Sequence, residues 1–380
     1  MLRHFAPLLA PLLASGLMLL AGPGRAAPPE GCDLEHPDGS RGCTRAAVDR
    51  LHLNDLQAVG THNSYKQAIP PGEMAVLAAG AADTARTLDY SHPPLSDQLD
   101  AGARQLEIDL LYDPGAGGRF ADPLMRKFAG AKAGPYDPTP MRGPGLKVMH
   151  VQDVDFRSSC ALFTLCLKTI RAWSLAHPGH LPILILINLK EDDVPVPGSV
   201  KAVKFDPAGM DSIDAEIRSV FPANALVTPD VVQGRHATLR EGALAGGWPT
   251  LSKARGRVLF ALDAEPDQVA RYRGARRSLE GRVMFVNIDE ASPAAAYITL
   301  NDPLAEGGRI KRDVALGLLV RTRADADTME ARSGDTARRE AAFASGAQYV
   351  STDYMRADPR FGAYSVALPG GGRGRESPAR

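Results

Sequence analysis

Two histidines in this chain lie where an acid–base pair could work. His62 stands in the segment Gly60-Thr-His-Asn-Ser-Tyr65, directly after a short apolar run, and His150 ends a second apolar run. A histidine takes up or releases a proton near neutral pH, so two of them can act as general base and general acid. Such a pair suits phosphodiester cleavage, in which one side chain deprotonates the attacking hydroxyl or water and the other protonates the departing alkoxide. We interpret His62 and His150 as the candidate catalytic residues.

Side chains with oxygen atoms accompany the two histidines at the ends of apolar runs. These candidate metal ligands are Asn63, Glu107, Asp109 and Asn188. Carboxylate and amide oxygens suit Ca²⁺, and Mg²⁺ less well. A zinc site built on histidine alone is disfavoured, because only two histidines belong to the set. The set therefore predicts a calcium site, and Lys190, two residues beyond the last of these ligands, is predicted to bind substrate through a phosphate oxygen.

Each of these residues also has a purely structural interpretation. Glu107 and Asp109 could be salt-bridged residues of a barrel wall, His150 a hydrogen-bonded core histidine, and Lys190 the start of a solvated acidic turn. Each structural interpretation is the better one when a residue is considered alone. Their coincidence at the ends of successive apolar runs favours a common site.

The elements that must position these residues form a repeating pattern. Eight runs read as strands, and they cover residues 56–59, 105–110, 146–150, 183–189, 257–262, 283–288, 316–320 and 348–351. Most are followed by helical segments, predicted at 75–88, 162–176, 211–221, 265–279, 304–314 and 326–345. This alternation predicts a single-domain α/β fold, a (β/α)8 TIM-type barrel, whose active site lies at the carboxyl ends of its strands. An open doubly wound sheet fits the alternation too, but no Gly-x-Gly-x-x-Gly opens a helix after a strand.

Composition and the chain ends limit the class of protein. Lys and Arg total 44 and Asp and Glu also total 44, so no basic field favours nucleic acid or an anionic membrane. Residues 1–26 resemble a cleavable signal peptide, with a membrane anchor as the alternative, so a secreted or periplasmic protein is expected. A disulfide-closed extension is predicted at 27–50, the barrel at 51–366 and a disordered tail at 367–380.

The four cysteines all follow the predicted signal peptide. Their even number in an exported chain predicts two local disulfides, Cys32 with Cys43 and Cys160 with Cys166, although other pairings stay open. No Cys-x-x-Cys spacing accompanies them, so a cysteine zinc site is disfavoured. The segment 113–145 is rich in Gly and Pro and is too long for an ordinary connection, which indicates a functional loop over a site.

A family resemblance rests on these same segments. The segments that carry it are Gly60-Thr-His-Asn-Ser-Tyr65, Gln105-Leu-Glu-Ile-Asp109, Val148-Met-His150, Asn188-Leu-Lys190, Val320-Arg-Thr-Arg-Ala-Asp-Ala-Asp327 and Ala344-Ser-Gly-Ala-Gln-Tyr-Val-Ser-Thr-Asp-Tyr354. From about residue 54 to 355 the chain resembles the phosphatidylinositol-specific phospholipase C-like phosphodiesterases. More narrowly, it resembles the secreted bacterial calcium-dependent phosphoinositide phospholipases C.

The resemblance implies a role for each site residue. His62 becomes the general base, His150 the general acid, and Asn63, Glu107 and Asp109 the metal ligands, with Arg321 a further substrate-binding residue. At Asn188 the chain departs from its relatives, which usually have glutamate there, so this ligand would bring an oxygen but no charge. Metal-independent relatives have an arginine where the ion would be, and the Glu107/Asp109 pair argues against that arrangement here.

The sequence thus predicts an exported, calcium-dependent phosphoinositide phospholipase C that is a monomer and contacts a membrane surface transiently. The apolar side chains of the long loop, among them Phe128, would either contact lipid or pack inward. Two rivals stay open. A glycerophosphodiester phosphodiesterase would share the barrel and the histidine–carboxylate set, and a catalytically silent lipid- or phosphate-binding module would bind its ligand without turnover.

Overall fold

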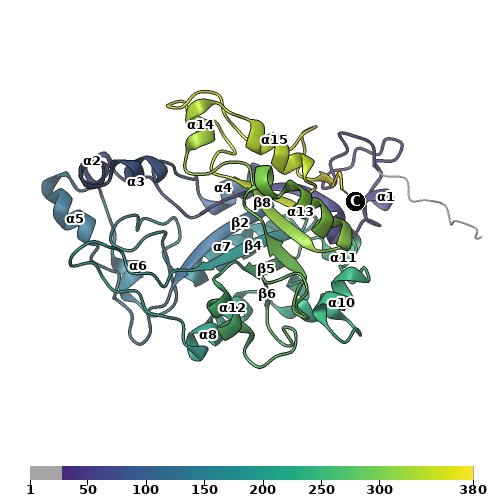
Figure 1. The fold of residues 1–380 in the computed structure, drawn as a ribbon, viewed down its shortest axis with the longest axis horizontal. Helices are drawn as coiled ribbons and strands as arrows, with labels where there is room; N and C mark the ends of the chain where they lie inside the picture. Colours follow the sequence, from purple (N-terminus) through teal and green to yellow (C-terminus); the bar gives the residue numbers. More distant parts are fainter. Residues whose placement is uncertain (1–27, 380) are drawn as a thin grey trace, which may run out of the picture.

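The computed structural model describes residues 28–379, in which eight parallel strands form a barrel (Figure 1). The strands are β1 (Leu56–Thr61), β2 (Gln105–Leu111), β4 (Ile183–Leu189), β5 (Val258–Leu262), β6 (Met284–Val286), β7 (Tyr297–Thr299), β8 (Leu319–Arg323) and β9 (Tyr349–Thr352). Their order in the sheet is β6-β5-β4-β2-β1-β9-β8-β7. A parallel bridge between Asn287 and Tyr297 joins the two end strands, so the barrel is nearly closed and the predicted fold is confirmed.

The barrel strands are apolar because both of their faces are covered. β4 is aliphatic except for one polar residue, Asn188, and pairs in parallel with β2 and β5. β1 approaches β2 closely at Gly60, where an added Cβ atom would lie 2.4 Å from the Cβ of Gln105. Only glycine allows this approach, and it fixes the position of the polar segment that follows β1.

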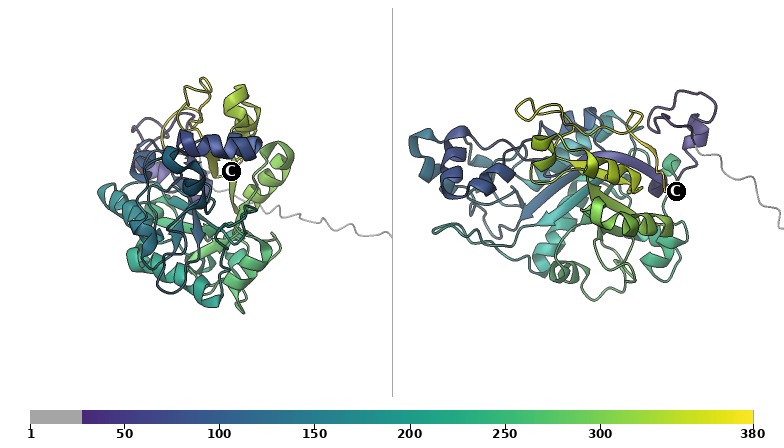
Figure 2. Two further views of the ribbon diagram at one scale, coloured as in Figure 1. Left: turned by 90° about the vertical axis from the view of Figure 1, so that its left-hand side faces the viewer. Right: turned by 45° about the horizontal axis from the view of Figure 1, so that its top comes forward.

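Helices surround the barrel (Figure 2). The longest are α7 (Phe163–Ala176), α8 (Pro207–Val220) and α13 (Pro303–Leu316), and each buries one apolar face. The shorter helices beside them are α1 (Arg45–Val48), α4 (Leu95–Asp100), α9 (Pro229–Gln233), α10 (Leu239–Leu244), α11 (Leu251–Ala254), α12 (Pro266–Arg273), α14 (Met329–Ser333) and α15 (Ala337–Ala344). Single 3₁₀ turns lie at Leu53–Asp55, Gly130–Lys132 and Ala223–Ala225.

One of the eight predicted barrel strands is wrong, and one strand of the barrel was not predicted. The run 146–150 contributes only β3 (Lys147–Val148), which lies antiparallel to β2 and outside the barrel. The chain returns from the long loop beside β2, so it arrives in the opposite direction to a barrel strand. The missing strand is β7, three residues long, which follows β6 without a helix between them.

The ends of several other predicted elements also shift. The strand expected at 316–320 is β8, which begins at Leu319, because α13 continues to Leu316 and ends at Gly317 with φ 101°. The helix expected at 326–345 is divided into α14 and α15 at Gly334, whose φ is 72°. The helix expected at 75–88 is likewise divided, into α2 (Pro71–Gly80) and α3 (Ala82–Thr87).

A lobe projects from the carboxyl ends of the first barrel strands (Figure 1). It contains α2, α3, α5 (Leu124–Ala129) and α6 (Thr139–Arg142), and it has its own apolar cluster, separate from the barrel core. The predicted functional loop is thus part of a folded lobe. A buried ion pair between Glu73 of α2 and Arg157, with Nη1–Oε2 2.5 Å, fastens the lobe to the chain that follows His150.

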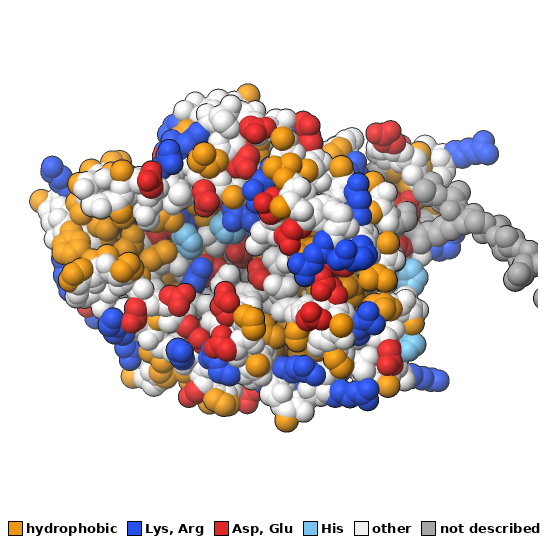
Figure 3. Space-filling model, in the orientation of Figure 1, with side chains coloured by type: hydrophobic (Ala, Val, Ile, Leu, Met, Phe, Trp, Pro, Cys, Tyr) orange, Lys and Arg blue, Asp and Glu red, His pale blue; other side chains and the backbone are white. Residues whose placement is uncertain are grey.

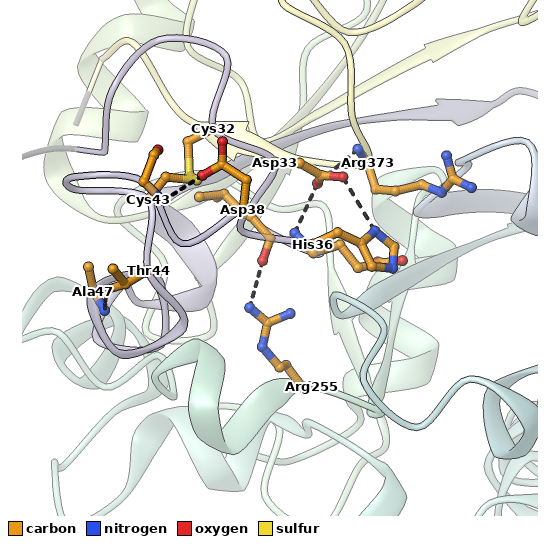
Figure 4. Close-up of a disulfide and its surroundings, with 12 residues drawn as sticks. Cys32, Asp33, His36, Asp38, Cys43, Thr44, Ala47, Arg255 and Arg373 are labelled. Carbon is orange, nitrogen blue, oxygen red and sulfur yellow. Dashed lines mark hydrogen bonds and ion pairs between the residues drawn. A yellow bond between two sulfur atoms is a disulfide. The ribbon is translucent and has the colours of Figure 1, made fainter.

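The N-terminal extension and the tail pack together against the opposite end of the barrel. Both predicted disulfides are present, with Cα–Cα separations of 5.5 Å for Cys32–Cys43 and 5.2 Å for Cys160–Cys166. Beside the first disulfide, the Asp33 carboxylate accepts a hydrogen bond from the backbone N–H of Arg373 (Figure 4). The extension is thereby tied to the tail.

The prediction of a disordered tail is wrong for the part of the tail that pairs with the barrel. Residues Arg375–Glu376 form β10, antiparallel to β1, and extend the sheet where the strand edge of β1 would otherwise be free. The predicted signal peptide, residues 1–26, lies outside the described residues. Within residues 28–379, no helix combines the length and the apolar character that crossing a membrane requires.

Candidate active site

His62 lies just beyond β1, at the carboxyl end of the barrel. The next residue, Asn63, has φ 46°, a left-handed conformation that asparagine tolerates and that turns the chain out of the strand. The Nδ1 atom of His62 lies 2.9 Å from Oδ1 of the buried Asp353, which follows β9. An ionised carboxylate only accepts hydrogen bonds, so Nδ1 carries the proton and Nε2 keeps a lone pair. His92 Nε2 donates to the His62 carbonyl at 2.8 Å and fixes the backbone.

The electrostatic surroundings keep His62 neutral. Burial and the neighbouring Arg323 lower the pKa of His62 to about 3, although Asp353 opposes the shift. Arg323 Nη1 lies 3.5 Å from His62 Nε2, and its Nη2 lies 3.3 Å from Asp353 Oδ2. Burial would raise the pKa of Asp353, but His62 and Arg323 lower it below its usual range. His62 is therefore a neutral imidazole that can accept a proton at Nε2, beside a guanidinium that attracts an anion.

His150 has a second aspartate partner of the same kind. It does not end a barrel strand but follows β3, where the chain folds back so that Val151 pairs with Asp155. His150 Nδ1 lies 2.9 Å from Oδ2 of the buried Asp155, and Lys66 Nζ lies 3.3 Å from the same oxygen. Burial opposes the effect, but Lys66 and His150 lower the pKa of Asp155. The contact with Asp155 orients the His150 ring through Nδ1 and leaves Nε2 as the atom through which a general acid would act.

A chain of buried contacts joins the two histidine–aspartate pairs. Lys66 Nζ lies 4.6 Å from the centre of the Tyr90 ring, and it donates to the Tyr90 carbonyl at 2.8 Å. The Tyr90 hydroxyl in turn lies 3.4 Å from His62 Nδ1 and accepts a hydrogen bond from Asn63 Nδ2 at 2.8 Å. The two histidines therefore belong to one connected site.

The candidate metal ligands include a buried oxygen without a hydrogen-bond partner. This atom is Oδ1 of Asn63, whose amide nitrogen is held by Tyr90. A buried polar atom without a partner is costly, and a cation would satisfy it. Burial raises the pKa of Glu107 to about 7, even though the neighbouring Arg321 opposes the shift. Its Oε1 lies 3.7 Å from His62 Nε2.

Basic side chains already contact both candidate carboxylates. Arg321 Nη2 donates to Glu107 Oε2 at 2.7 Å, and Lys190 Nζ lies 2.8 Å from Asp109 Oδ2. Burial alone would lower the pKa of Lys190, but the neighbouring Asp109 raises it above its usual value. In residues 28–379, no group of three or more His, Cys, Asp or Glu side chains is arranged to hold a metal ion. The residues therefore fit a calcium site that depends on the neutral oxygen of Asn63 and competes with two basic side chains.

The structure brings most of the predicted site residues together. Asn188 lies opposite Asp109 in the register of β4 and β2. Arg321 is buried within the barrel between Glu107 and Asn301, both of which its guanidinium contacts. The roles predicted for these side chains stay predictions.

Sequence reasoning missed several residues of the site, which are Lys66, Tyr90, His92, Asp155, Arg323 and Asp353. Arg323 and Asp353 end the eighth-strand and ninth-strand segments, so the rule that polar residues gather at strand ends could have found them. Asp155 lies in a turn beyond a barrel-external strand, where that rule gives no signal. The same rule gives no signal for Lys66, which lies four residues beyond His62 and does not end a strand.

Two cavities open at the carboxyl end of the barrel, and one of them includes His150 in its lining. A polar one of about 720 Å³ lies over the ends of β4 to β7 and is lined by Asn188, Lys190, Asp263 and Asn287, among others. An apolar one of about 740 Å³ lies between the barrel and the lobe and includes His150 and Lys190 in its lining. Figure 3 shows histidine side chains in a hollow, with hydrophobic side chains gathered beside it on the lobe. The site thus lies at a boundary between a polar and an apolar surface.

A parallel β/α barrel that holds two histidine–aspartate pairs beside carboxylates suits acid–base chemistry at the carboxyl ends of its strands. Residues 51–378 match the profile of the family described as phosphoinositide phospholipase C, Ca²⁺-dependent. The chain therefore belongs to this family, as its sequence resemblance predicts, and the family is Ca²⁺-dependent.

Solved structures with the same fold agree with this membership. The calcium-dependent phosphoinositol-specific phospholipase C of Pseudomonas sp., in its apo form with myoinositol, shares 18% identity over 86% of this chain and 96% of its own, with a TM-score of 0.53. The Ca²⁺-dependent phosphatidylinositol-specific phospholipase C of Streptomyces antibioticus shares 20% identity over 80% of this chain and 95% of its own, with a TM-score of 0.51. At these identities the similarity establishes the fold. No curated protein sequence matches the chain.

Proposed function

We propose that the enzyme cleaves a phosphoinositide by attack of the inositol 2-hydroxyl on its own phosphate. His62 Nε2 takes the proton of this hydroxyl, whose oxygen forms the new bond to phosphorus. The bond from phosphorus to the glycerol oxygen breaks, and His150 donates its proton to that oxygen. The products are diacylglycerol and a cyclic inositol phosphate, and every proton that is removed or supplied has an assigned histidine.

The observation that carries this proposal is the pair of 2.9 Å contacts from each histidine Nδ1 to a buried aspartate. Both contacts leave Nε2 as the atom that exchanges protons with substrate. The two surroundings then differ in the direction that the two roles require. Arg323 lies 3.5 Å from His62 Nε2 and disfavours a proton there, which suits a base, whereas the side-chain partner of His150 is the carboxylate of Asp155, which suits an acid.

The chain's own residues also bind the phosphate and the head group. The Arg323 guanidinium beside His62 and the Lys190 ammonium at the rim of both cavities attract the phosphodiester anion. The polar cavity beside β4 to β7 offers amide and carboxylate groups that suit the hydroxyls of an inositol ring. Family membership and the Pseudomonas structure with myoinositol support this assignment of the head group.

Asn63, Glu107 and Asp109 would hold Ca²⁺, with Asn188 as a neutral fourth oxygen. When bound, the ion neutralises phosphate charge and makes the attacking hydroxyl more acidic. Because no glutamate stands at the position of Asn188, and because Lys190 and Arg321 contact the two carboxylates, we expect weak binding, with a dissociation constant of about 10⁻⁴–10⁻³ M.

We also propose that the enzyme is exported to the periplasm or the medium and acts as a monomer. The two disulfides support an oxidising compartment. Both histidine–aspartate pairs come from one chain, so a single copy supplies the complete acid–base machinery. The exposed apolar residues of the lobe, such as Phe128, support transient contact with a membrane surface.

Phosphorus NMR of phosphatidylinositol turnover tests the reaction. We expect the native protein to release a cyclic inositol phosphate with Ca²⁺, and His62→Ala or His150→Ala to lower the rate by about 10³-fold. Release of alcohol from glycerophosphodiesters without a cyclic phosphate would instead identify a glycerophosphodiester phosphodiesterase. Binding of the lipid without any turnover would identify a silent binding module.

A further inference from the structure

The apolar cavity between the barrel and the lobe has no role in the acid–base chemistry. Aliphatic and aromatic side chains of three helices and two loops line most of it, among them Val76, Leu77, Met125, Phe128, Val151 and Val194. We call this cavity the lobe groove. Its volume of about 740 Å³ is that of a cavity that holds a small organic molecule.

We propose that the lobe groove binds an acyl chain of the leaving diacylglycerol. This inference rests on the proposed function, in which His150 protonates the glycerol oxygen. That oxygen must lie within hydrogen-bond distance of the His150 ring, and the acyl esters are attached to the neighbouring carbons of the same glycerol. The chains therefore begin beside His150, which itself lines one end of the groove.

The groove and the polar cavity adjoin each other at two residues. Lys190 and Asp192 line both of them, so they mark the boundary between a polar and an apolar compartment. A phosphoinositide has the same division, since its phosphate separates a polyol from hydrocarbon chains. With the phosphate near Lys190 and the ring in the polar cavity, the lobe groove is the surface that the hydrocarbon reaches.

The walls of the groove are fixed by buried polar contacts and do not depend on a ligand to form. Asp153, at φ 66°, accepts hydrogen bonds through Oδ1 from the N–H of Leu124 at 2.8 Å and through Oδ2 from the N–H of Val200 at 2.5 Å. This one carboxylate joins α5 and the loop after β4 to the turn beyond His150. On the other side, the buried Glu73–Arg157 pair fixes α2. A preformed apolar site binds a chain without the entropic cost of ordering its own side chains and loops.

The glycine at the end of α2 provides a sharp test. Gly80 lines the groove, and a Cβ atom added there would meet nothing within 4 Å, so Gly80→Leu is the change designed to add apolar bulk at the groove. Gly308 of α13 is a matched control, because it too is exposed, has empty space around an added Cβ, and lies outside the groove. Gly308→Leu should change neither chain binding nor turnover.

The experiment compares phosphatidylinositols with acyl chains of about four to seven carbons, all below their critical micelle concentrations. For the native enzyme we expect kcat/KM to rise by up to about fourfold per methylene, the effect of burying one CH₂ group. In Gly80→Leu this dependence should flatten, while the rate with the shortest chain stays within about twofold of the native rate. Equal kcat/KM for all chain lengths in the native enzyme would overturn the proposal.

Two further results separate the alternatives. Calorimetric titration of monomeric monoacylglycerols tests the groove without turnover, so chain-dependent binding in a protein that cleaves no phosphoinositide would refute the proposed function and retain the groove. If Gly80→Leu instead weakens adsorption to phosphatidylinositol vesicles and leaves monomer kinetics unchanged, the groove contacts the bilayer surface and our assignment of a single acyl chain is wrong.

Discussion

The two histidine–aspartate pairs allow the base and the acid to be told apart by one type of substitution. Asp353→Asn and Asp155→Asn each replace a buried carboxylate, 2.9 Å from a histidine Nδ1, by a side chain of the same shape. Two opposite unit charges about 4 Å apart attract by about 4 kcal/mol at an effective dielectric constant of about 20. Loss of that attraction in the transition state corresponds to about a 10³-fold fall in rate.

The two variants should respond differently to the leaving group. Inositol phosphodiesters with an alkoxide or a nitrophenolate leaving group provide the assay, because nitrophenolate departs without being protonated. In Asp353→Asn we expect the rate to fall by about 10³-fold with both substrates, since His62 must still deprotonate the attacking hydroxyl. In Asp155→Asn the rate should fall by about 10³-fold with the alkoxide leaving group and by less than about tenfold with nitrophenolate. A leaving group that needs no proton does not need the general acid.

A control variant and a folding check accompany the two site variants. Asp358→Asn, which removes a carboxylate that pairs with Arg360 away from the site, should leave both rates within about twofold of the native rates. Thermal unfolding checks that all three variants are folded. The opposite pattern, with rescue of Asp353→Asn by nitrophenolate, would make His150 the base. Equal losses of both site variants with both substrates would refute the division of roles.

Three further predictions concern the metal, the barrel and the extension. Lys190→Met should tighten Ca²⁺ binding by about tenfold in a calorimetric titration, because it removes the cation that competes for Asp109, and an unchanged affinity would remove both residues from the metal site. Gly60→Ala should lower the free energy of unfolding in urea by about 2 kcal/mol, because the new Cβ would lie 2.4 Å from an atom of β2, and a stability equal to that of the native protein would mean that the strands separate freely. Burial opposes the shift, but Arg104 lowers the pKa of Glu35, so the stability from this buried pair exists above the ordinary glutamate pKa and is lost as the pH falls. Glu35→Gln should cost about 3 kcal/mol at neutral pH and progressively less as the pH falls through the lowered pKa of Glu35, and a cost independent of pH would contradict this account.

The sequence predicted those features that depend on local pattern. The aliphatic run of β4 indicated a strand buried on both faces, and the even number of cysteines, close together in two pairs, predicted both disulfides. β7 escaped detection, because three residues without a following helix carry too little periodicity to be distinguished from a loop. β10 lies in a Gly- and Arg-rich tail whose composition predicts disorder, and only the free edge of β1 gives it a partner.

In the candidate site, too, local pattern predicted some features and long-range contacts determined others. His62, Glu107 and Asp109 follow or lie in barrel strands, so their convergence followed from the fold. The interactions that give each histidine its role join segments far apart in sequence, as His62 and Asp353 are, and no local pattern encodes such a contact. The partnership of Arg321 with Glu107 was missed for the same reason, although Arg321 itself was predicted as a substrate-binding residue.

The different origins of the two histidines suit the two sides of the reaction. His62 follows β1 and contacts Asp353 beyond β9, so the proposed base is fixed relative to the barrel. His150 belongs to the turn beyond β3 and lines the lobe groove, so the proposed acid is fixed relative to the proposed site of the acyl chain. Lys66 and Tyr90 connect the two at their buried side, which couples the barrel to the lobe. A change in the lobe should therefore alter the choice of lipid chain without altering the attack on phosphorus.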